Sequence, residues 1–146
     1  KEEVGVIEGL DGRKMSKSYQ NTIPVFCPQK RLKKLINKIK TDSTPPEEPK
    51  STEGSTLFNL YKIFATAEQT QAYAKQFQEG ISWGEAKAQL FEVVNARLAG
   101  PREKYDEMMA NPEVVDVVLK EGARRAREKA QAVLARVHKA IGKGGV

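Results

Sequence analysis

The sequence predicts a mainly α protein, a helical bundle preceded by a short extended segment and a basic loop. Three observations indicate this fold class. Apolar residues recur at helical spacing over much of the chain after residue 28. Helix start and stop signals divide that part into consecutive helices. The 146 residues are 39% hydrophobic, which is enough to bury a modest core without disulfide bonds.

The amino-terminal part of the chain is expected to be non-helical. Residues 4–7 predict a short strand or extended piece, which runs into a flexible turn containing Gly9, Asp11 and Gly12. A basic loop follows this turn directly. The turn therefore offers a hinge immediately before a group of lysine and serine residues.

Residues 28–39 predict a short basic helix. Its apolar residues recur at helical spacing, and they are Leu32, Leu35, Ile36 and Ile39. Pro28 suits the first helical position, where the missing N–H costs nothing. Residues 41–55 contain three prolines together with many serine, threonine and glutamate residues, so we expect a surface loop there.

Five further helices are predicted after this loop. Their start signals are, in chain order, Ser55 or Thr56, Thr66 with Gln69, Ser82 with Glu85, Gly100-Pro101, and Asn111-Pro112. The second and third signals have the spacing of a capping box, and the last two place a proline at the first helical position. Gly80 is the expected end of the second of these helices.

The last predicted helix has an apolar stripe along one side. The stripe contains Val115, Val118, Leu119, Gly122, Ala126, Ala130, Val133, Val137 and Ile141. Its small members would let a neighbouring helix approach closely. The same helix region is basic, since residues 120–143 contain eight lysine or arginine residues and two glutamates. Their local net charge of +6 equals that of the whole chain. A polyanionic partner is therefore plausible.

The composition also excludes some classes of function. The single cysteine, Cys27, cannot form an internal disulfide, so a cytoplasmic location is expected. No apolar run approaches the roughly 20 residues needed to span a bilayer, so we expect no membrane function. His138 has no second histidine, cysteine or aspartate at metal-ligand spacing, and no metal site is predicted.

Residues 14–18 form the sharpest chemical signal in the chain. They read Lys-Met-Ser-Lys-Ser, so two ammonium groups and two hydroxyls fall within five residues. Such a loop offers positive charge and short hydrogen-bond donors to a phosphate chain. It is a candidate polyphosphate-binding loop. The competing interpretation is a solvated basic loop with no ligand.

The pentapeptide is identical to the KMSKS signature of class I aminoacyl-tRNA synthetases, and its surroundings resemble the tryptophanyl-tRNA synthetase family. The similar segments are residues 9–13, 21–24, 41–43, 48–50, 57–58, 60–61, 83–85 with Lys87, 102–105 and 122–127. They occur in the same order as in that family, over essentially the whole chain. A match extending over so many segments lowers the risk that the pentapeptide is accidental.

The resemblance implies an enzyme that uses ATP to activate L-tryptophan and then transfers it to tRNA(Trp). It implies that residues 1–27 end the nucleotide-binding catalytic domain and that residues 28–146 form a helical tRNA-binding domain. ATP contacts are expected from Lys14, Met15, Ser16, Lys17 and Ser18, with Mg²⁺ accompanying ATP. The catalytic role is expected of Lys14 and Lys17, because their charge suits the leaving pyrophosphate. Met15 is expected to anchor the loop on apolar surface.

Two features of the family are missing from the sequence. Its second signature, a His-x-Gly-His type motif, is absent, since the only histidine is His138. The tryptophan pocket is also expected outside this chain. The chain is therefore expected to be a C-terminal fragment that is inactive alone, with the phosphate loop disordered or displaced. The complete enzyme is expected to be a homodimer.

The basic face of the last helix is the predicted RNA-binding surface. Its candidate residues are Lys120, Arg124, Arg127 and Lys139, whose charges suit contacts with phosphate. The alternative is a solvated helix exterior. Trp83 could stack on a base, but we expect it in the core. Two other functions stay open from the residues alone, a non-catalytic helical RNA-binding module and a helical scaffold.

Overall fold

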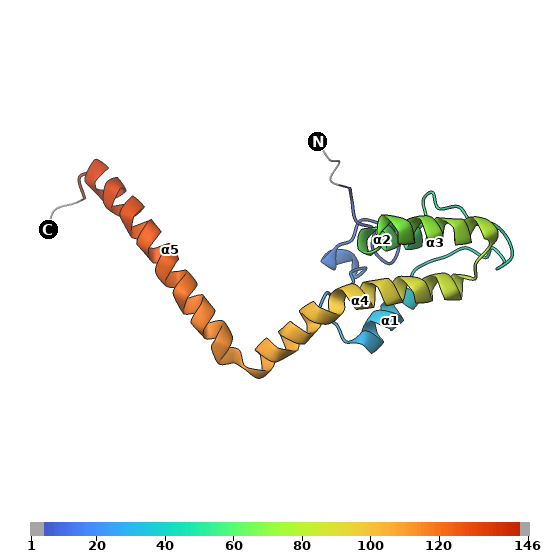
Figure 1. Ribbon diagram of the computed structural model, residues 1–146. Coiled ribbons are helices and arrows are strands. Elements are labelled where there is room, and N and C mark those ends of the chain that lie inside the picture. The colour runs from blue at the N-terminus through green and yellow to red at the C-terminus, as the bar shows by residue number, and fades with distance from the viewer. Residues whose placement is uncertain (1–4, 144–146) are drawn as a thin grey trace. The chain divides into compact units, whose positions relative to one another are not determined.

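The computed structural model describes residues 5–143, and the chain divides into two units at Glu103 and Lys104 (Figure 1). The helices are α1 (Gln29–Asn37), α2 (Thr56–Phe64), α3 (Ala67–Glu79), α4 (Trp83–Ala110), α5 (Pro112–Ala140) and a short 3₁₀ helix, η1 (Lys17–Tyr19). Among the described residues there is no β-strand. The mainly α prediction is therefore confirmed.

The predicted helix boundaries depend on local capping, and most of them are confirmed. Thr66 and Gln69 form the capping box of α3, with the Gln69 N–H donating to Thr66 Oγ1 at 3.2 Å and the Thr66 N–H donating to Gln69 Oε1 at 2.9 Å. The Ser55 hydroxyl caps α2. Gly80 ends α3 with a φ of 96°, and a Cβ there would lie 2.8 Å from two carbonyl oxygens of the loop before α2.

One prediction about helix boundaries was wrong. The separate helices expected at Ser82 and Gly100-Pro101 are one helix, α4, with Pro101 inside it. Proline deprives the Arg97 carbonyl of its helical partner, but both residues are exposed, so water can satisfy that oxygen. The amino-terminal segment, predicted as a short strand or an extended piece, contains no strand within residues 5–7, and Glu8 pairs with Lys14 in an isolated bridge. Val4 lies outside the described residues.

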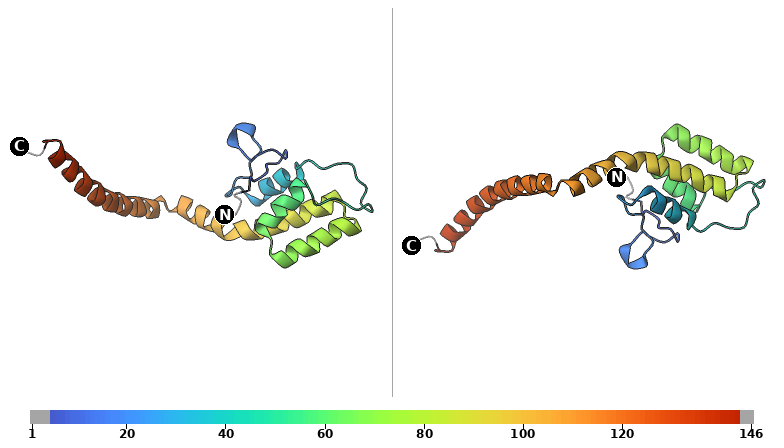
Figure 2. Two further views of the ribbon diagram at one scale, coloured as in Figure 1. Left: turned by 90° about the horizontal axis from the view of Figure 1, so that it is seen from above. Right: turned by 90° about the horizontal axis from the view of Figure 1, so that it is seen from below.

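The first unit buries an apolar core between α1, α2, α3 and α4. Its most deeply buried large residues are Leu32, Ile36, Ile39, Leu57, Leu60, Tyr73, Phe77, Leu90 and Val94. Helices α2 and α3 pack against each other and lie side by side in Figures 1 and 2. The Tyr73 ring stacks on Tyr61 with 4.0 Å between ring centroids, and its hydroxyl donates to the Ala86 carbonyl at 2.9 Å. Burial raises the pKa of Tyr73.

The loop between α1 and α2 is fastened to this core by Lys50. The Lys50 backbone N–H donates to the Phe77 carbonyl at 2.7 Å, and its buried ammonium donates to the carbonyls of Pro45 and Glu48. The same ammonium lies 5.3 Å from the centre of the Trp83 ring. Trp83 itself is half-buried and meets Phe77 edge to face, so the core expectation for Trp83 is only partly correct.

The second unit contains the end of α4 and the whole of α5, whose residues are all exposed. The predicted apolar stripe is present on α5, but no residue of that helix is buried. A Cβ on Gly122 would find nothing within 4 Å, so no other part of the described chain packs closely at this position. No helix within residues 5–143 is long and apolar enough to cross a membrane.

Candidate functional site

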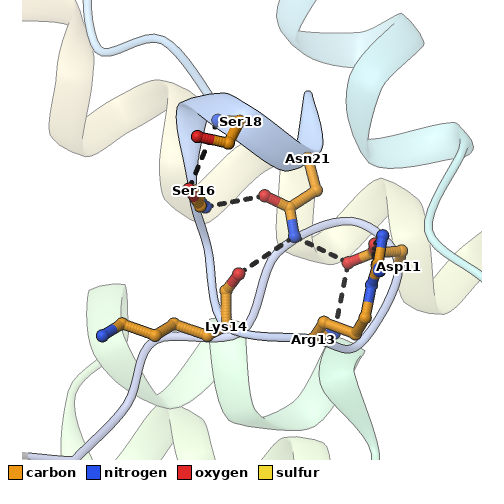
Figure 3. Close-up of polar contacts among 6 residues, drawn as sticks. All are labelled: Asp11, Arg13, Lys14, Ser16, Ser18 and Asn21. Carbon is orange, nitrogen blue, oxygen red and sulfur yellow. Dashed lines mark hydrogen bonds and ion pairs between the residues drawn. The ribbon is translucent and has the colours of Figure 1, made fainter.

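The basic loop at residues 14–18, which the sequence analysis expected to be disordered or displaced, has a defined local conformation. Met15 donates its N–H to the Ile7 carbonyl at 2.8 Å, next to the bridge between Glu8 and Lys14. The Ser16 hydroxyl caps η1 by accepting from the Ser18 N–H at 3.3 Å. Short-range bonds of this kind order the loop through its own residues and their immediate neighbours (Figure 3).

The Asn21 side chain is the centre of these contacts, and we call them the Asn21 clamp. Its Nδ2 donates to Asp11 Oδ1 at 2.7 Å and to the Lys14 carbonyl at 3.2 Å, and its Oδ1 accepts the Ser16 N–H at 2.8 Å. Asn21 is only 3% exposed. One buried amide therefore joins the turn before the loop to both ends of the Lys14–Ser16 segment (Figure 3).

Gly9 makes room for this clamp. A Cβ on Gly9 would lie 2.3 Å from Cγ and Nδ2 of Asn21 and 2.7 Å from the Asn21 carbonyl oxygen. That carbonyl accepts the Leu10 N–H at 3.0 Å, so the backbone at Asn21 is held as well. The sequence marked Gly9 as part of a turn and of a family resemblance, and Asn21 as part of that resemblance alone. The spacing of these two residues matches no local motif, so the sequence did not predict their contact.

Asp11 is the charged member of the clamp. The hydrogen bond from Asn21 and the contacts with Arg13 lower the pKa of Asp11 to about 2. Arg13 donates from Nε to Asp11 Oδ2 at 2.7 Å and lies over the Tyr19 ring at 4.5 Å. Asp11 is thus ionised at neutral pH, and Arg13 offsets its negative charge beside the loop.

The two predicted catalytic lysines are exposed and free to meet a ligand. Neither Lys14 nor Lys17 forms an ion pair with any residue of the described part of the chain. The Lys14 side chain extends away from the clamp (Figure 3). Met15 is partly buried and packs against the core of the first unit, as expected for an anchor. The loop can therefore present two ammonium groups from a fixed backbone.

The four predicted RNA contacts on α5 are all exposed, but they differ in their surroundings. Arg124 pairs with Glu121 at 2.7 Å and also with Glu128. Its positive charge is therefore largely offset within its own helix. In the described chain, Lys120, Arg127 and Lys139 form no ion pair.

Helical geometry does not bring all four residues to one face. At about 100° per residue, Lys120, Arg124 and Arg127 share a side of α5, whereas Lys139 lies about 100° away from Lys120. A second basic group, which the sequence analysis did not identify, lies on another side beside Gly122. It contains Arg125, Lys129 and Arg136, and the first two line a shallow hollow of ≈ 230 Å³.

The first unit also contains a cavity of ≈ 410 Å³ that the sequence analysis missed. It is lined by the segment after α1, the turn into α2 and the start of α4: Lys40, Thr41, Asp42, Ser51, Glu53, Gly54, Ser55, Thr56, Leu57 and Trp83. We call it the Asp42 cavity. Asp42 Oδ1 accepts the Thr44 N–H at 2.8 Å and Trp83 Nε1–H at 3.1 Å. These bonds, led by Thr44, lower the pKa of Asp42. The cavity thus combines an aromatic wall, an ionised carboxylate and hydroxyl groups.

Residues 3–99 match the family described as tRNA synthetases class I (W and Y). The chain is 48% identical, over 97% of its length, to a tryptophan–tRNA ligase of Xanthomonas campestris pv. campestris, of which it covers 33%. It is 45% identical to that of Neisseria meningitidis serogroup A, covering 97% of this chain and 42% of the relative.

A solved structure is similar over the same part of the chain. The crystal structure of tryptophanyl-tRNA synthetase from Campylobacter jejuni, complexed with ADP and tryptophan, matches with a TM-score of 0.92 and 40% identity, over 97% of this chain and 45% of that one. This chain thus spans less than half the length of the relatives it matches.

Proposed function

Since this chain belongs to the tryptophanyl-tRNA synthetases, a class I tRNA synthetase family, we propose that it takes part in the ATP-dependent attachment of L-tryptophan to tRNA(Trp). Residues 1–27 would contribute the phosphate loop of the catalytic domain, and residues 28–146 would bind tRNA. The observation that carries the catalytic part is the pair of unpaired lysines on a loop ordered by the Asn21 clamp. A homodimeric enzyme in the cytoplasm is part of the same proposal.

The loop would act in the first of the two steps. The carboxylate of tryptophan attacks the α-phosphorus of ATP, the bond to the β-phosphate oxygen breaks, and pyrophosphate leaves with the bonding electrons. Negative charge therefore grows on the pyrophosphate in the transition state. Lys14 and Lys17 stabilise this charge more than that of ground-state ATP, which accelerates the step. Ser16 and Ser18 would orient phosphate oxygens through their hydroxyls and backbone amides.

A Mg²⁺ ion bound with ATP would be held mainly by phosphate oxygens and water. Among residues 5–143 no three carboxylate, histidine or cysteine side chains converge on one point. The described residues would contribute to charge stabilisation through the two lysines.

The proposed catalytic function is tested by tryptophan-dependent exchange of pyrophosphate into ATP. We expect exchange with the complete gene product and none with residues 1–146 alone, because the loop supplies charge but the tryptophan site is expected elsewhere. Robust exchange by residues 1–146 alone would contradict the expectation that the tryptophan site lies outside them. A complete gene product that binds ATP and tryptophan without exchange would refute the function itself.

For RNA, we propose that α5 contacts the tRNA backbone and that the Asp42 cavity takes an unstacked base. Lys120 and Arg127 are the strongest backbone candidates, because they form no ion pair in the described part of the chain, whereas Arg124 is paired with two glutamates. The Trp83 ring offers a stacking surface at the cavity. The ionised Asp42 carboxylate is an acceptor only, so it favours a base with an exocyclic amino group, such as cytosine or adenine.

Backbone contact and base reading predict different results in one binding assay. Replacing Lys120 and Arg127 with alanine should flatten the plot of log affinity against log salt, by about 0.7–0.9 in slope for each lost phosphate contact. This change should weaken tRNA(Trp) and a non-cognate tRNA equally. Asp42→Asn should instead weaken tRNA(Trp) more than the non-cognate tRNA, with little change in slope. Fluorescence anisotropy at several salt concentrations measures both quantities.

Two further variants serve as controls for this assay. Arg124→Ala should flatten the slope less than Arg127→Ala, because Glu121 and Glu128 already offset the Arg124 charge. Asp116→Asn removes an exposed carboxylate of α5 and should leave discrimination unchanged. Unchanged slopes after loss of Lys120 and Arg127 would make α5 a solvated surface. Equal weakening of both tRNAs by Asp42→Asn would exclude base reading at the cavity.

A further inference from the structure

We propose that Glu8 is a positioning residue, which fixes the Lys14 segment of the phosphate loop to the first turns of α2. This proposal rests on the proposed function, because it gives Glu8 a role in the step that Lys14 assists. Glu8 lies outside the KMSKS pentapeptide and cannot contact phosphate favourably, since its carboxylate would repel it. Its effect on the reaction must therefore pass through the position of Lys14.

The backbone of Glu8 is paired with the loop. Glu8 and Lys14 form an isolated antiparallel bridge, and the neighbouring Met15 N–H donates to the Ile7 carbonyl at 2.8 Å. The Ile7–Glu8 segment thus acts as a short template for the backbone that carries Lys14. A shift of Glu8 moves this backbone with it.

The side chain of Glu8 is held by a different part of the molecule. Its Oε2 accepts the Thr56 hydroxyl at 2.6 Å, and its Oε1 accepts Asn59 Nδ2–H at 2.9 Å. Both donors are on α2, 48 and 51 residues further along the chain. Each carboxylate oxygen therefore has its own donor, which fixes the orientation of the carboxylate as well as its place.

Helix α2 is a firm anchor for this contact. The Ser55 hydroxyl caps its first turn, and Leu57 and Leu60, on the same turns as Thr56 and Asn59, are almost completely buried in the core. The turn before the loop also lies close to this point, since a Cβ on Gly12 would be 3.3 Å from Thr56 Oγ1. The anchor is thus rigid where Glu8 meets it.

Glu8 supplies something that the Asn21 clamp does not. The side-chain bonds of the clamp join residues 11–21 to one another, so they fix the internal shape of the loop. The Glu8 bonds fix the loop relative to α2. A catalytic charge must be placed within a fraction of an ångström, and a misplacement of about 1 Å can reduce a rate by roughly a hundredfold. Position relative to the core therefore matters as much as internal order.

The test uses the complete gene product and removes the anchor from each side. Thr56→Val deletes the hydroxyl without changing the shape of the side chain, at a site on α2 that does not touch the loop lysines. Glu8→Ala deletes both acceptors. We expect each to lower the maximal rate of pyrophosphate exchange about tenfold or more, with a smaller change in the KM for ATP. Thr70→Val, which removes a hydroxyl bonded only within α3, should match wild type.

A double-mutant cycle tests whether Glu8 acts through Lys14. If it does, adding Glu8→Ala to Lys14→Ala should lower the exchange rate little further, because there is no longer a charge to position. Additive losses, or a rate for Thr56→Val equal to that of Thr70→Val, would overturn the proposal. If Glu8→Ala lowers the thermal midpoint severely, Glu8→Gln, which keeps one acceptor, replaces it in the cycle. Absence of exchange in wild type would instead be a failure of the proposed function.

Discussion

Replacing Lys17 with alanine in the complete gene product is expected to slow tryptophan activation by roughly a hundred- to a thousandfold, equivalent to about 3–4 kcal/mol of transition-state stabilisation. Lys17 is exposed, has no ion pair in the described chain and begins η1, whose cap at Ser16 is held by the Asn21 clamp. Its ammonium group is therefore available to the leaving pyrophosphate. ATP binding should weaken far less, because the charge on pyrophosphate is greatest in the transition state.

Single-turnover measurements over a range of ATP concentrations separate these two effects. Lys30→Ala, which removes an exposed lysine of α1, is the matched control and should leave both the maximal rate and ATP affinity unchanged. A higher apparent Kd for ATP with an unchanged maximal rate would mean that Lys17 binds ground and transition states equally. Such a result would remove Lys17 from the catalytic group.

Replacing Gly9 with alanine is expected to reduce the same rate by roughly a hundredfold, although Gly9 lies outside the KMSKS pentapeptide. The new methyl group would lie 2.3 Å from two side-chain atoms of Asn21. Rotation of the Asn21 side chain cannot relieve the whole clash, since the Asn21 carbonyl oxygen is only 2.7 Å away and is itself bonded to Leu10. The clamp must therefore open, which frees the Lys14 and Ser16 backbone. Overpacking of this kind also costs about 1–3 kcal/mol of folding free energy.

Gly5→Ala is the control for this change, because a Cβ there would meet nothing within 4 Å. Exchange rates and thermal unfolding of both variants should be measured together. Amide hydrogen exchange adds a direct view of the loop: the Ser16 N–H, which Asn21 Oδ1 accepts, should lose protection in Gly9→Ala and keep it in Gly5→Ala. Wild-type activity of Gly9→Ala would show that the clamp does not set the loop geometry.

Much of the helical structure could be predicted because its signals are local. The capping box at Thr66 and the glycine at Gly80 act within one helical turn, so a few neighbouring residues determine them. The error at Pro101 also has a local cause. Gly100-Pro101 has the composition of a helix start, but the exposed helix tolerates a proline in its interior, and the signal alone does not distinguish the two cases.

The chemical groups of the candidate site could be named from the sequence, but their arrangement could not. The pentapeptide at residues 14–18 indicates groups suited to phosphate, because charge and hydroxyl content are properties of the residues themselves. Asp42 and Trp83, 41 residues apart, lie together at one cavity only in the folded chain. The choice among the basic residues of α5 also needed the structure, which showed that Arg124 is paired and Arg127 is not.

The sequence by itself determined the family, the helical class, the capping of most helices and the lysine charge that we propose for phosphate. Only the tertiary structure decided what holds that charge in place. The Asn21 clamp depends on a chain reversal that brings residues 9 and 21 into contact, and the Glu8 anchor depends on α2. Hydrogen bonds between residues so far apart in the chain follow no periodic pattern in the sequence. Their geometry depends instead on how α2 packs in the core.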